Sequence, residues 1–388
     1  MSIFYENTPN YTNAAIIVNE NNIANNVKII KKLVSPAKVM VVVKANAYGL
    51  GSVKVSEIVL NAGADALGVA NAQEGIILRN NNIKAPILIL SPIFKEDYVK
   101  VINNSLTPTF FTYKDSYNFN ETCKDLNKTS NIHIKLDTGM NRIGFKVTNI
   151  ESDVNTVIKD IIKISDLSNI KIEGMFTQFA SSYSNNEFTN LQLKLYNKVI
   201  TQLHQLSIII PIKHVSNSGA VIKQPQLNMD MVRCGIMVYG MSPASNTQSV
   251  NELKSLGIKQ VFEVMSRIAQ VKTVKKGEGI GYSQSFIAPY DMQIATAPVG
   301  YADGLSRQLS NKGNVIINGV RCNIVGSICM DQFMIDVTQT SAKVGDKITV
   351  IGNNGSYTNL AEDIANLQGT INYEVATSLS LRIPTYYV

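Results

Sequence analysis

The chain has 388 residues, of which 45% are hydrophobic and 17% are charged, and its formal net charge at pH 7 is +7. This length is typical of two or three domains, and the apolar fraction is that of a globular protein with a sizeable core. No stretch reaches the roughly 18 apolar residues of a membrane helix, and the positive charge is too dispersed to predict binding to nucleic acid.

The N-terminal sequence and the cysteines indicate the cellular compartment. The first residues, MSIFYENTPNYTN, lack the basic and then apolar pattern of an export signal. The four cysteines lack the paired spacing of metal ligands and are scattered along the chain, at Cys123, Cys234, Cys322 and Cys329. We therefore expect reduced thiols, a cytoplasmic location, no membrane association and no metal site.

Residues 14–18 (AAIIV) predict a short strand, and from residue 37 a rhythm of strand and then helix repeats. The expected strands are 39–44, 66–70, 86–90, 108–111, 131–136, 170–175, 211–215 and 229–233. The helices expected between them include 52–62, 72–80, 95–103, 114–127, 153–164 and 187–206. Eight strands at this spacing favour a closed (β/α)8 barrel over an open sheet.

The rhythm changes to short alternating strands after about residue 243. These strands are expected at 261–274, 292–298, 314–318, 320–328, 333–337 and 347–351, with one helix at 358–366. We therefore predict an α/β fold with a TIM-like barrel at 18–245 and a mainly-β domain at 246–388. The strand within residues 1–17 is expected to join the β domain.

The segment 38–51, KVMVVVKANAYGLG, contains the first strand of the predicted barrel. Its apolar run lacks alternation, which is typical of a strand buried on both faces. The run ends at Lys44, at the carboxyl end of the strand, where barrels bind their ligands. A desolvated lysine with a lowered pKa can react with a carbonyl compound such as pyridoxal phosphate (PLP). The alternative is a strand-end lysine whose amine simply reaches solvent.

Further polar residues lie at the ends of the later strands of the barrel. They are Lys135 and Arg142 at the fifth strand, Thr177 and Gln178 after the sixth, Ser218 after the seventh and Arg233 at the eighth. Because the carboxyl ends of barrel strands meet on one face, we expect these residues to converge. A lysine, two arginines and the N–H groups of a Ser-Gly turn suit a phosphorylated carbonyl cofactor and a carboxylate.

Seven segments of the chain resemble sequences of the alanine racemase family. The members of this family are PLP enzymes of fold type III. The seven segments occur in the family's order and are VVVKANAYGLG (41–51), KLDTGMNRIGF (135–145), HVSNSGA (214–220), MVRCGIMVYG (231–240), GIGYSQSF (279–286), VGYADGLSR (299–307) and SICMDQF (327–333). The resemblance implies PLP-dependent racemisation of a small amino acid, most readily L-alanine to D-alanine.

The resemblance also implies a role for individual residues. Lys44 would hold PLP and act as one catalytic base, and Tyr282 from the β domain of a second subunit would act as the opposite base. Inverting a stereocentre requires two bases on opposite faces of the substrate, which supports this assignment. The resemblance therefore implies a homodimer with shared active sites.

The remaining residues implied by the resemblance bind cofactor or substrate. Arg233 would face the pyridine nitrogen, and the other cofactor-binding residues would be Tyr48, Asn217, Ser218, Gly235 and Ile236. The substrate side would include Arg142, Met330 and Tyr301, with Arg307 at the substrate access route. Lys135 matches a family lysine that is often carbamylated, and an interior lysine paired with Asp137 is an equal alternative.

Three positions depart from the family pattern. Gln178 stands where the family usually has a histidine that tunes the tyrosine base, and a glutamine cannot carry a proton. Leu381 replaces a tyrosine that contacts phosphate and substrate, and Ser327 replaces an arginine. These departures leave open a preference for serine or a larger amino acid.

Two other functions also remain open. One is a fold type III amino-acid decarboxylase, and the other is a PLP-binding regulatory protein without catalysis. Among the histidines, His214 is interpreted as structural or as part of the access route, and His133 and His204 as incidental.

Overall fold

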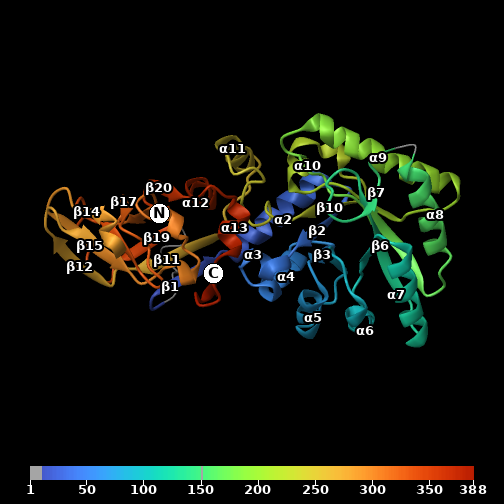
Figure 1. Cartoon of the computed structure of the whole chain (residues 1–388), viewed down its shortest axis with the longest axis horizontal. Coiled ribbons are helices and arrows are strands. Elements are labelled where there is room, and N and C mark those ends of the chain that lie inside the picture. The colour runs from blue at the N-terminus through green and yellow to red at the C-terminus, as the bar shows by residue number, and fades with distance from the viewer. Residues whose placement is uncertain (1–10, 150–151) are drawn as a thin grey trace. The chain divides into compact units, whose positions relative to one another are not determined.

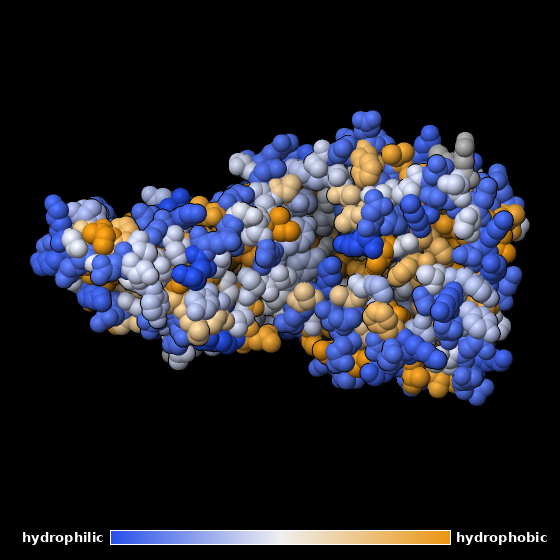
Figure 2. Space-filling view, viewed as in Figure 1, coloured by the Kyte–Doolittle hydropathy of each residue, from blue (hydrophilic) through white to orange (hydrophobic). Residues whose placement is uncertain are grey.

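The computed structural model describes residues 11–149 and 152–388, so residues 1–10 of the predicted N-terminal segment lie outside it. The chain divides into two compact units (Figure 1). The first, which we call the barrel unit, comprises residues 24–47 and 52–238. The second, the β unit, comprises the described residues up to Ile23, residues 48–51 and residues 239–388. In the view of Figure 2, hydrophobic residues occur as scattered patches among hydrophilic ones.

The barrel unit is a ring of eight parallel strands. They are β2 (Lys38–Val42), β3 (Ala66–Val69), β4 (Ile87–Ile89), β5 (Thr109–Phe110), β6 (Ser130–Asp137), β8 (Ile170–Phe176), β9 (Ile212–His214) and β10 (Met231–Cys234). Pairing links β10-β2-β3-β4 and β5-β6-β8-β9. The ring closes because Ile89 N donates to Thr107 O at 2.9 Å and Arg233 N donates to Ser216 O at 2.9 Å. The predicted (β/α)8 barrel is therefore confirmed.

Helices surround the strands in the expected alternation. They are α4 (Ser52–Asn61), α5 (Ala72–Asn80), α6 (Lys95–Asn103), α7 (Tyr113–Asp125), α8 (Asp153–Ser165), α9 (Asn186–Gln205) and α10 (Ser218–Lys223), preceded by α2 (Glu20–Val34). Helices α2 and α10 and the short strand β7 (Phe145–Lys146) were not expected from the sequence. Helix α2 is rich in asparagine, which disfavours helix, but its fully buried stripe of Ile23, Val27 and Ile30 has helical spacing.

A left-handed turn follows strand β2. It is the short element α3 (Lys44–Tyr48), in which Ala45, Asn46 and Ala47 have φ angles of 52°, 53° and 54°. An L-residue in this conformation costs roughly 1–2 kcal/mol, so three in succession need stabilising contacts from their surroundings. One such contact is the hydrogen bond from Ala47 N to Val43 O at 2.8 Å.

The β unit contains a large mixed sheet. Its strand order is β12-β15-β18-β17-β16-β19-β11-β1-β21, and β20 pairs with β19. The strands are β1 (Ala14–Val18), β11 (Phe262–Arg267), β12 (Gln270–Val274), β15 (Met292–Ala297), β16 (Asn314–Ile317), β17 (Val320–Val325), β18 (Phe333–Asp336), β19 (Lys347–Asn354), β20 (Tyr357–Asn359) and β21 (Thr385–Tyr387). Strand β1 pairs antiparallel with β11 and parallel with β21, so the sheet joins residues 14–18 to residues 385–387.

Two expected elements of the β unit differ in the structure. The single strand expected at 261–274 is two strands, because the chain changes partners at residues 268–269. There Ile268 N donates to Asp346 O and Ala269 N donates to Thr296 O. The expected helix at 358–366 begins later, as α12 (Ala361–Gln368), because residues 357–359 pair with β19 as β20.

Other elements of the β unit were not anticipated. They are the hairpin β13 (Gly279–Ile280) and β14 (Phe286–Ile287), and the helices α11 (Thr247–Ser255) and α13 (Asn372–Thr377). No helix in the described ranges is long and apolar enough to cross a membrane.

Glu263 is a buried carboxyl group in strand β11, with 1% of its surface exposed. Burial raises its pKa from 4.5 to about 7, although Asn353 N donates to its Oε1 at 3.1 Å. Because the folded-state pKa lies above the unfolded value, the contribution of Glu263 to stability is fully present below pH 4.5 and is lost as the pH rises through about 7.

We expect Glu263→Gln to remove this pH dependence. The wild-type protein should lose about 3 kcal/mol of unfolding free energy between pH 4.5 and high pH through this group alone, and the variant should not. Urea unfolding at pH 5 and pH 8 measures the difference. The exposed Glu278, in the same unit, provides the control variant Glu278→Gln. An equal pH dependence in wild type and Glu263→Gln would contradict the prediction.

Candidate active site

Most of the residues singled out from the sequence lie at the carboxyl ends of the barrel strands. Lys44 is the second residue after β2, Lys135 lies near the end of β6, and Arg233 lies in β10. Two of these cations lie close to the ring of Phe176, the last residue of β8. Lys135 Nζ is 5.3 Å from its centroid and Arg233 Cζ is 5.2 Å from it. The barrel thus gathers positive charge at one end.

Lys44 has the character expected of a nucleophilic amine. Although Lys44 is exposed, the protein atoms around its amine partly desolvate it and lower its pKa; the Arg142 guanidinium lowers it further, and the Glu74 carboxylate raises it in part. A lowered pKa increases the fraction of neutral amine, which is the form that attacks a carbonyl carbon.

Lys135 is 4% exposed and carries an even more perturbed amine. Burial, followed by the Arg142 and Arg233 guanidinium groups, lowers its pKa to about 7. Asp137 does not form an ion pair with it among the described residues. Instead, the Asp137 carboxylate accepts hydrogen bonds from the backbone N–H groups of Gly139, Asn141 and Arg142, at 3.1, 2.9 and 2.8 Å. Asp137 therefore shapes the loop that carries Arg142.

Arg233 is 4% exposed and is fixed by its two terminal nitrogens. Nη1 donates to His214 O at 2.7 Å, and Nη2 donates to Thr177 O at 2.8 Å. A longer bond of 3.3 Å runs from Nη2 to Gln178 Oε1, so Gln178 does contact this arginine. The Nε of Arg233 has no hydrogen-bond partner in the described part of the chain. Burial lowers the pKa of Arg233 to about 10, which leaves it a cation at neutral pH.

A chain of buried polar groups extends from Arg233 through the barrel interior. Arg233 Nη1 lies 3.1 Å from His214 Nδ1, and His214 Nε2 lies 2.9 Å from His133 Nδ1. His133 Nε2 lies 3.3 Å from Glu173 Oε2. The structure therefore gives His133, which was interpreted as incidental, contacts with His214 and with Glu173, a residue that the sequence did not indicate. The signal for His133 was its position two residues before Lys135, which places both side chains on one face of the strand.

We expect both buried imidazoles to be neutral with the proton on Nε2. Burial lowers the pKa of His133 and brings that of His214 well below its usual value. Because a guanidinium can only donate, His214 Nδ1 must accept, and each following Nε2–H then donates towards Glu173. The ¹⁵N spectrum of histidine-labelled protein measures this, with exposed His204 as the reference among the three histidines. A proton on Nδ1 of either buried ring would contradict the prediction.

The expected phosphate-binding residues lie together after β9 and β10. Asn217 caps α10 through its Oδ1, which accepts from Ala220 N at 3.1 Å. Gly235 N donates to Ser218 Oγ at 3.3 Å, and Ile236 follows with 1% exposure. Backbone N–H groups at a helix start and a serine hydroxyl are suitable donors to a phosphate.

The other expected residues belong to the β unit. Tyr48 is buried, with its ring centroid 4.6 Å from that of Tyr239. In contrast, the side chains of Tyr282, Tyr301, Met330 and Leu381 are 71%, 43%, 54% and 89% exposed. These four exposed residues therefore present both polar and apolar atoms of the β unit to solvent.

The turn that carries Tyr282 is tightly constrained. Gly281 has a φ of 77°, and a Cβ at this position would lie 2.8 Å from Ser327 N. Ser285 Oγ lies 2.8 Å from Ser327 Oγ. The segment of Tyr301 is also fixed, in this case by backbone hydrogen bonds. Tyr301 N donates to Cys329 O at 3.1 Å, and Ala302 N donates to Met330 O at 3.0 Å.

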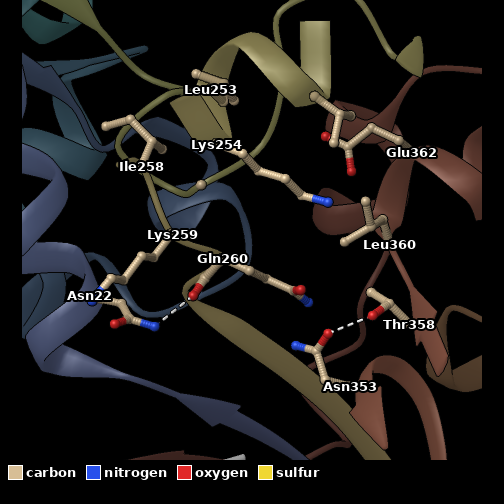
Figure 3. Close-up of a pocket in the computed structure, with 12 residues that line it drawn as sticks. Asn22, Leu253, Lys254, Ile258, Lys259, Gln260, Asn353, Thr358, Leu360 and Glu362 are labelled. Carbon is tan, nitrogen blue, oxygen red and sulfur yellow. Dashed lines mark hydrogen bonds between the residues drawn. The ribbon is translucent and has the colours of Figure 1, made fainter. Parts of the chain in front are cut away.

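Figure 3 shows a pocket of the β unit with a volume of about 340 Å³. Its lining comes mainly from α11, the residues after it, the β19–β20 hairpin and the start of α12, and includes Lys254, Gln260 and Glu362. None of the residues singled out from the sequence lines it. We therefore place the candidate active site at the barrel strand ends rather than in this pocket.

Comparisons with known proteins cover nearly the whole chain. The model of the alanine racemase N-terminal domain matches residues 18–243, and that of the C-terminal domain matches residues 261–387. The alanine racemase of Methanococcus maripaludis is 40% identical over 371 residues, which cover 94% of this chain and 96% of that protein.

Solved structures agree with the sequence comparisons. That of alanine racemase from Clostridium difficile 630 has a TM-score of 0.90 and 35% identity, covering 98% of this chain and 97% of that one. The structure of alanine racemase from Bartonella henselae with covalently bound pyridoxal phosphate has a TM-score of 0.85 and 26% identity, covering 97% of this chain and 100% of that one.

Proposed function

Because the chain belongs to the alanine racemase family, we propose that it is an isomerase that racemises L-alanine and D-alanine with PLP as cofactor. The observation that carries the proposal is the cluster of Lys44, Lys135, Arg142 and Arg233 at one end of the barrel, with the pKa of Lys44 lowered. This family assignment supports a racemase over the decarboxylase and the regulatory protein considered from the sequence.

The residues present fit PLP. Lys44 would hold it covalently. The Nε of the buried Arg233, which has no hydrogen-bond partner among the residues that the structure describes, is suited to donate to a ring nitrogen. Ser218 and the backbone at Gly235 and Ile236 would bind the phosphate, with Asn217 ordering the loop and Tyr48 contributing its hydroxyl. When bound, PLP supplies an electron sink for the negative charge that remains after Cα loses its proton.

Racemisation needs a proton removed from one face of Cα and one returned to the other. We assign these tasks to Lys44 and to Tyr282. Tyr282 is 71% exposed in the β unit, and we propose that it acts in the site of a second copy, so that a homodimer contains two shared sites. Arg142 and the backbone at Met330 would bind the substrate carboxylate, and Tyr301 would line the access route, with Arg307 beside it.

Lys135 is proposed to be carbamylated. With a pKa of about 7 its amine is largely neutral at cellular pH, so its nitrogen can bond to the carbon of CO₂ and release a proton. The carbamate would add negative charge between cations and orient Arg142. We expect a carbonyl resonance in the ¹³C spectrum of protein kept under ¹³CO₂, and none in Lys135→Gln. Its absence from the wild type would leave Lys135 as a free amine.

A preference for serine or a larger amino acid is the second candidate. Two observations favour it. Gln178, at a position where the family usually has histidine, accepts a hydrogen bond from Arg233. Leu381, at a position where the family usually has tyrosine, is 89% exposed. A leucine lacks the hydroxyl that would contact phosphate and substrate, so the space beside the substrate's Cβ should be altered.

Hydrogen exchange at Cα tests the proposed function. Purified protein with PLP is incubated in D₂O with L-alanine, L-serine or larger L-amino acids, and both enantiomers are quantified. Exchange with inversion, fastest on alanine, would support alanine racemisation. Faster turnover of another amino acid would support the second candidate. Bound PLP with no exchange on any amino acid would refute racemase activity.

A further inference from the structure

A carboxylate from a different element of the barrel unit holds the left-handed turn after Lys44. Glu74, in helix α5, accepts a hydrogen bond from Ala45 N at 2.8 Å through Oε1. Its Oε2 accepts one from Ala70 N at 2.7 Å. Ala45 and Ala70 follow the neighbouring strands β2 and β3. One carboxylate therefore ties together two strand ends at the candidate active site.

The position of Glu74 in its helix explains one of these bonds but not the other. Glu74 lies in the first turn of α5, and Asn71 caps that helix by accepting from Glu74 N at 2.9 Å. A glutamate at this place commonly reaches back to the N–H group of the capping residue, and here Oε2 reaches one residue further, to Ala70 N. Helix capping does not require the second oxygen, which instead contacts the residue directly after Lys44.

The turn that Glu74 contacts needs such a partner. Ala45, Asn46 and Ala47 all have left-handed backbone angles, although none of them is glycine. The N–H of Ala45 belongs to the peptide group that joins Lys44 to Ala45. The bond to Glu74 therefore fixes the plane of the peptide group next to Lys44. A hydrogen bond to a charged acceptor is shorter and stronger than one to a neutral acceptor.

Glu74 is also the negative charge that acts on Lys44. Two charged groups act on Lys44, namely Arg142 from the loop after β6 and Glu74 of α5. Those that act on Lys135 are Arg142, Arg233, Asp137 and Lys44 itself. Of the two that act on Lys44, only Glu74 opposes the effect of desolvation on its pKa.

We propose that Glu74 is a positioning residue for Lys44, which holds the strained turn by one oxygen and the end of the neighbouring strand β3 by the other. The inference rests on the proposed role of Lys44 in holding PLP. It predicts that the Lys44 amine loses both its orientation and part of its protonation when Glu74 is made neutral.

The test is the covalent uptake of PLP by the apoprotein, trapped by borohydride and followed across pH. Glu74→Gln keeps the shape and one acceptor but loses the charge. We expect its uptake to be about tenfold slower or more, because the amine is misplaced. We also expect its pH profile to move to lower pH, because the lysine loses a negative neighbour. Glu74→Asp, which keeps the charge, should restore the profile.

Asn71→Ala provides the matched control, because it weakens the cap of α5 and leaves both Glu74 oxygens in place. Its thermal stability should fall while its PLP uptake and pH profile stay those of the wild type. Equal uptake profiles in Glu74→Gln and wild type would overturn the inference, as would equal losses of uptake in Glu74→Gln and Asn71→Ala. If wild-type protein does not attach PLP to Lys44 by peptide mapping, the proposed function itself fails.

Discussion

Replacing Lys44 by alanine should abolish racemisation, with a loss in kcat of at least about 10⁴-fold. The residue is assigned two tasks, holding the cofactor and moving a proton at Cα, so no other group can replace it. Chiral chromatography of alanine after prolonged incubation with Lys44→Ala measures the loss. The absorbance spectrum of the protein with PLP should at the same time lack the band of covalently held cofactor.

The same strand offers a control. Lys38 is the first residue of β2 and is exposed, whereas Lys44 follows the other end of this strand. Lys38→Ala should keep wild-type kcat and spectrum. Racemisation by Lys44→Ala at a rate near the wild type would refute the assignment of this lysine.

Tyr282→Phe should lower racemisation by about 10²–10⁴-fold, because it removes the base on one face of the substrate. Exchange of the Cα hydrogen should be lost for one enantiomer of alanine and not for the other. Exchange of the Cα hydrogen by Lys44 should continue for one enantiomer in D₂O, and the product should keep its configuration. Tyr290, which is 47% exposed in the same unit, is the matched control, and Tyr290→Phe should retain full activity. Equal loss of exchange for both enantiomers would contradict the assignment.

The proposed sharing of sites gives this variant a second use. A mixture of Lys44→Ala and Tyr282→Phe subunits forms some mixed dimers, each with one site that has both bases. After dissociation and reassociation at equal amounts, activity should recover to about a quarter of the wild-type value. If each subunit instead used its own Lys44 and Tyr282, no recovery would occur.

The barrel was predictable because its signals are local. The valine run before Lys44 identifies a strand buried on both faces, and polar residues at its end identify the ligand-binding side. The same reasoning located Lys135 and Arg233, whose charged groups the structure places 5.3 and 5.2 Å from the centroid of the Phe176 ring. Strand ends in a closed barrel converge whatever the intervening helices are.

Features that depend on contacts between distant segments were not predictable. The division at residues 268–269 follows from a change of partner strand, which no local pattern records. The bond from Glu74 to Ala45 and the chain from Arg233 to Glu173 each join residues far apart in sequence. The left-handed turn was hidden for another reason, since Ala45 and Ala47 are residues that ordinarily favour a right-handed helix.

The position of β1 in its sheet has a consequence for synthesis in the cell. This strand is among the first described residues to leave the ribosome, yet its two neighbours are β11 and β21, and β21 ends at Tyr387. The sheet of the β unit can therefore be completed only after residues 385–387 have been translated. Residues 24–47 and 52–238 are translated before β11 and β21. The barrel unit can therefore fold on the ribosome while β1 is still unpaired.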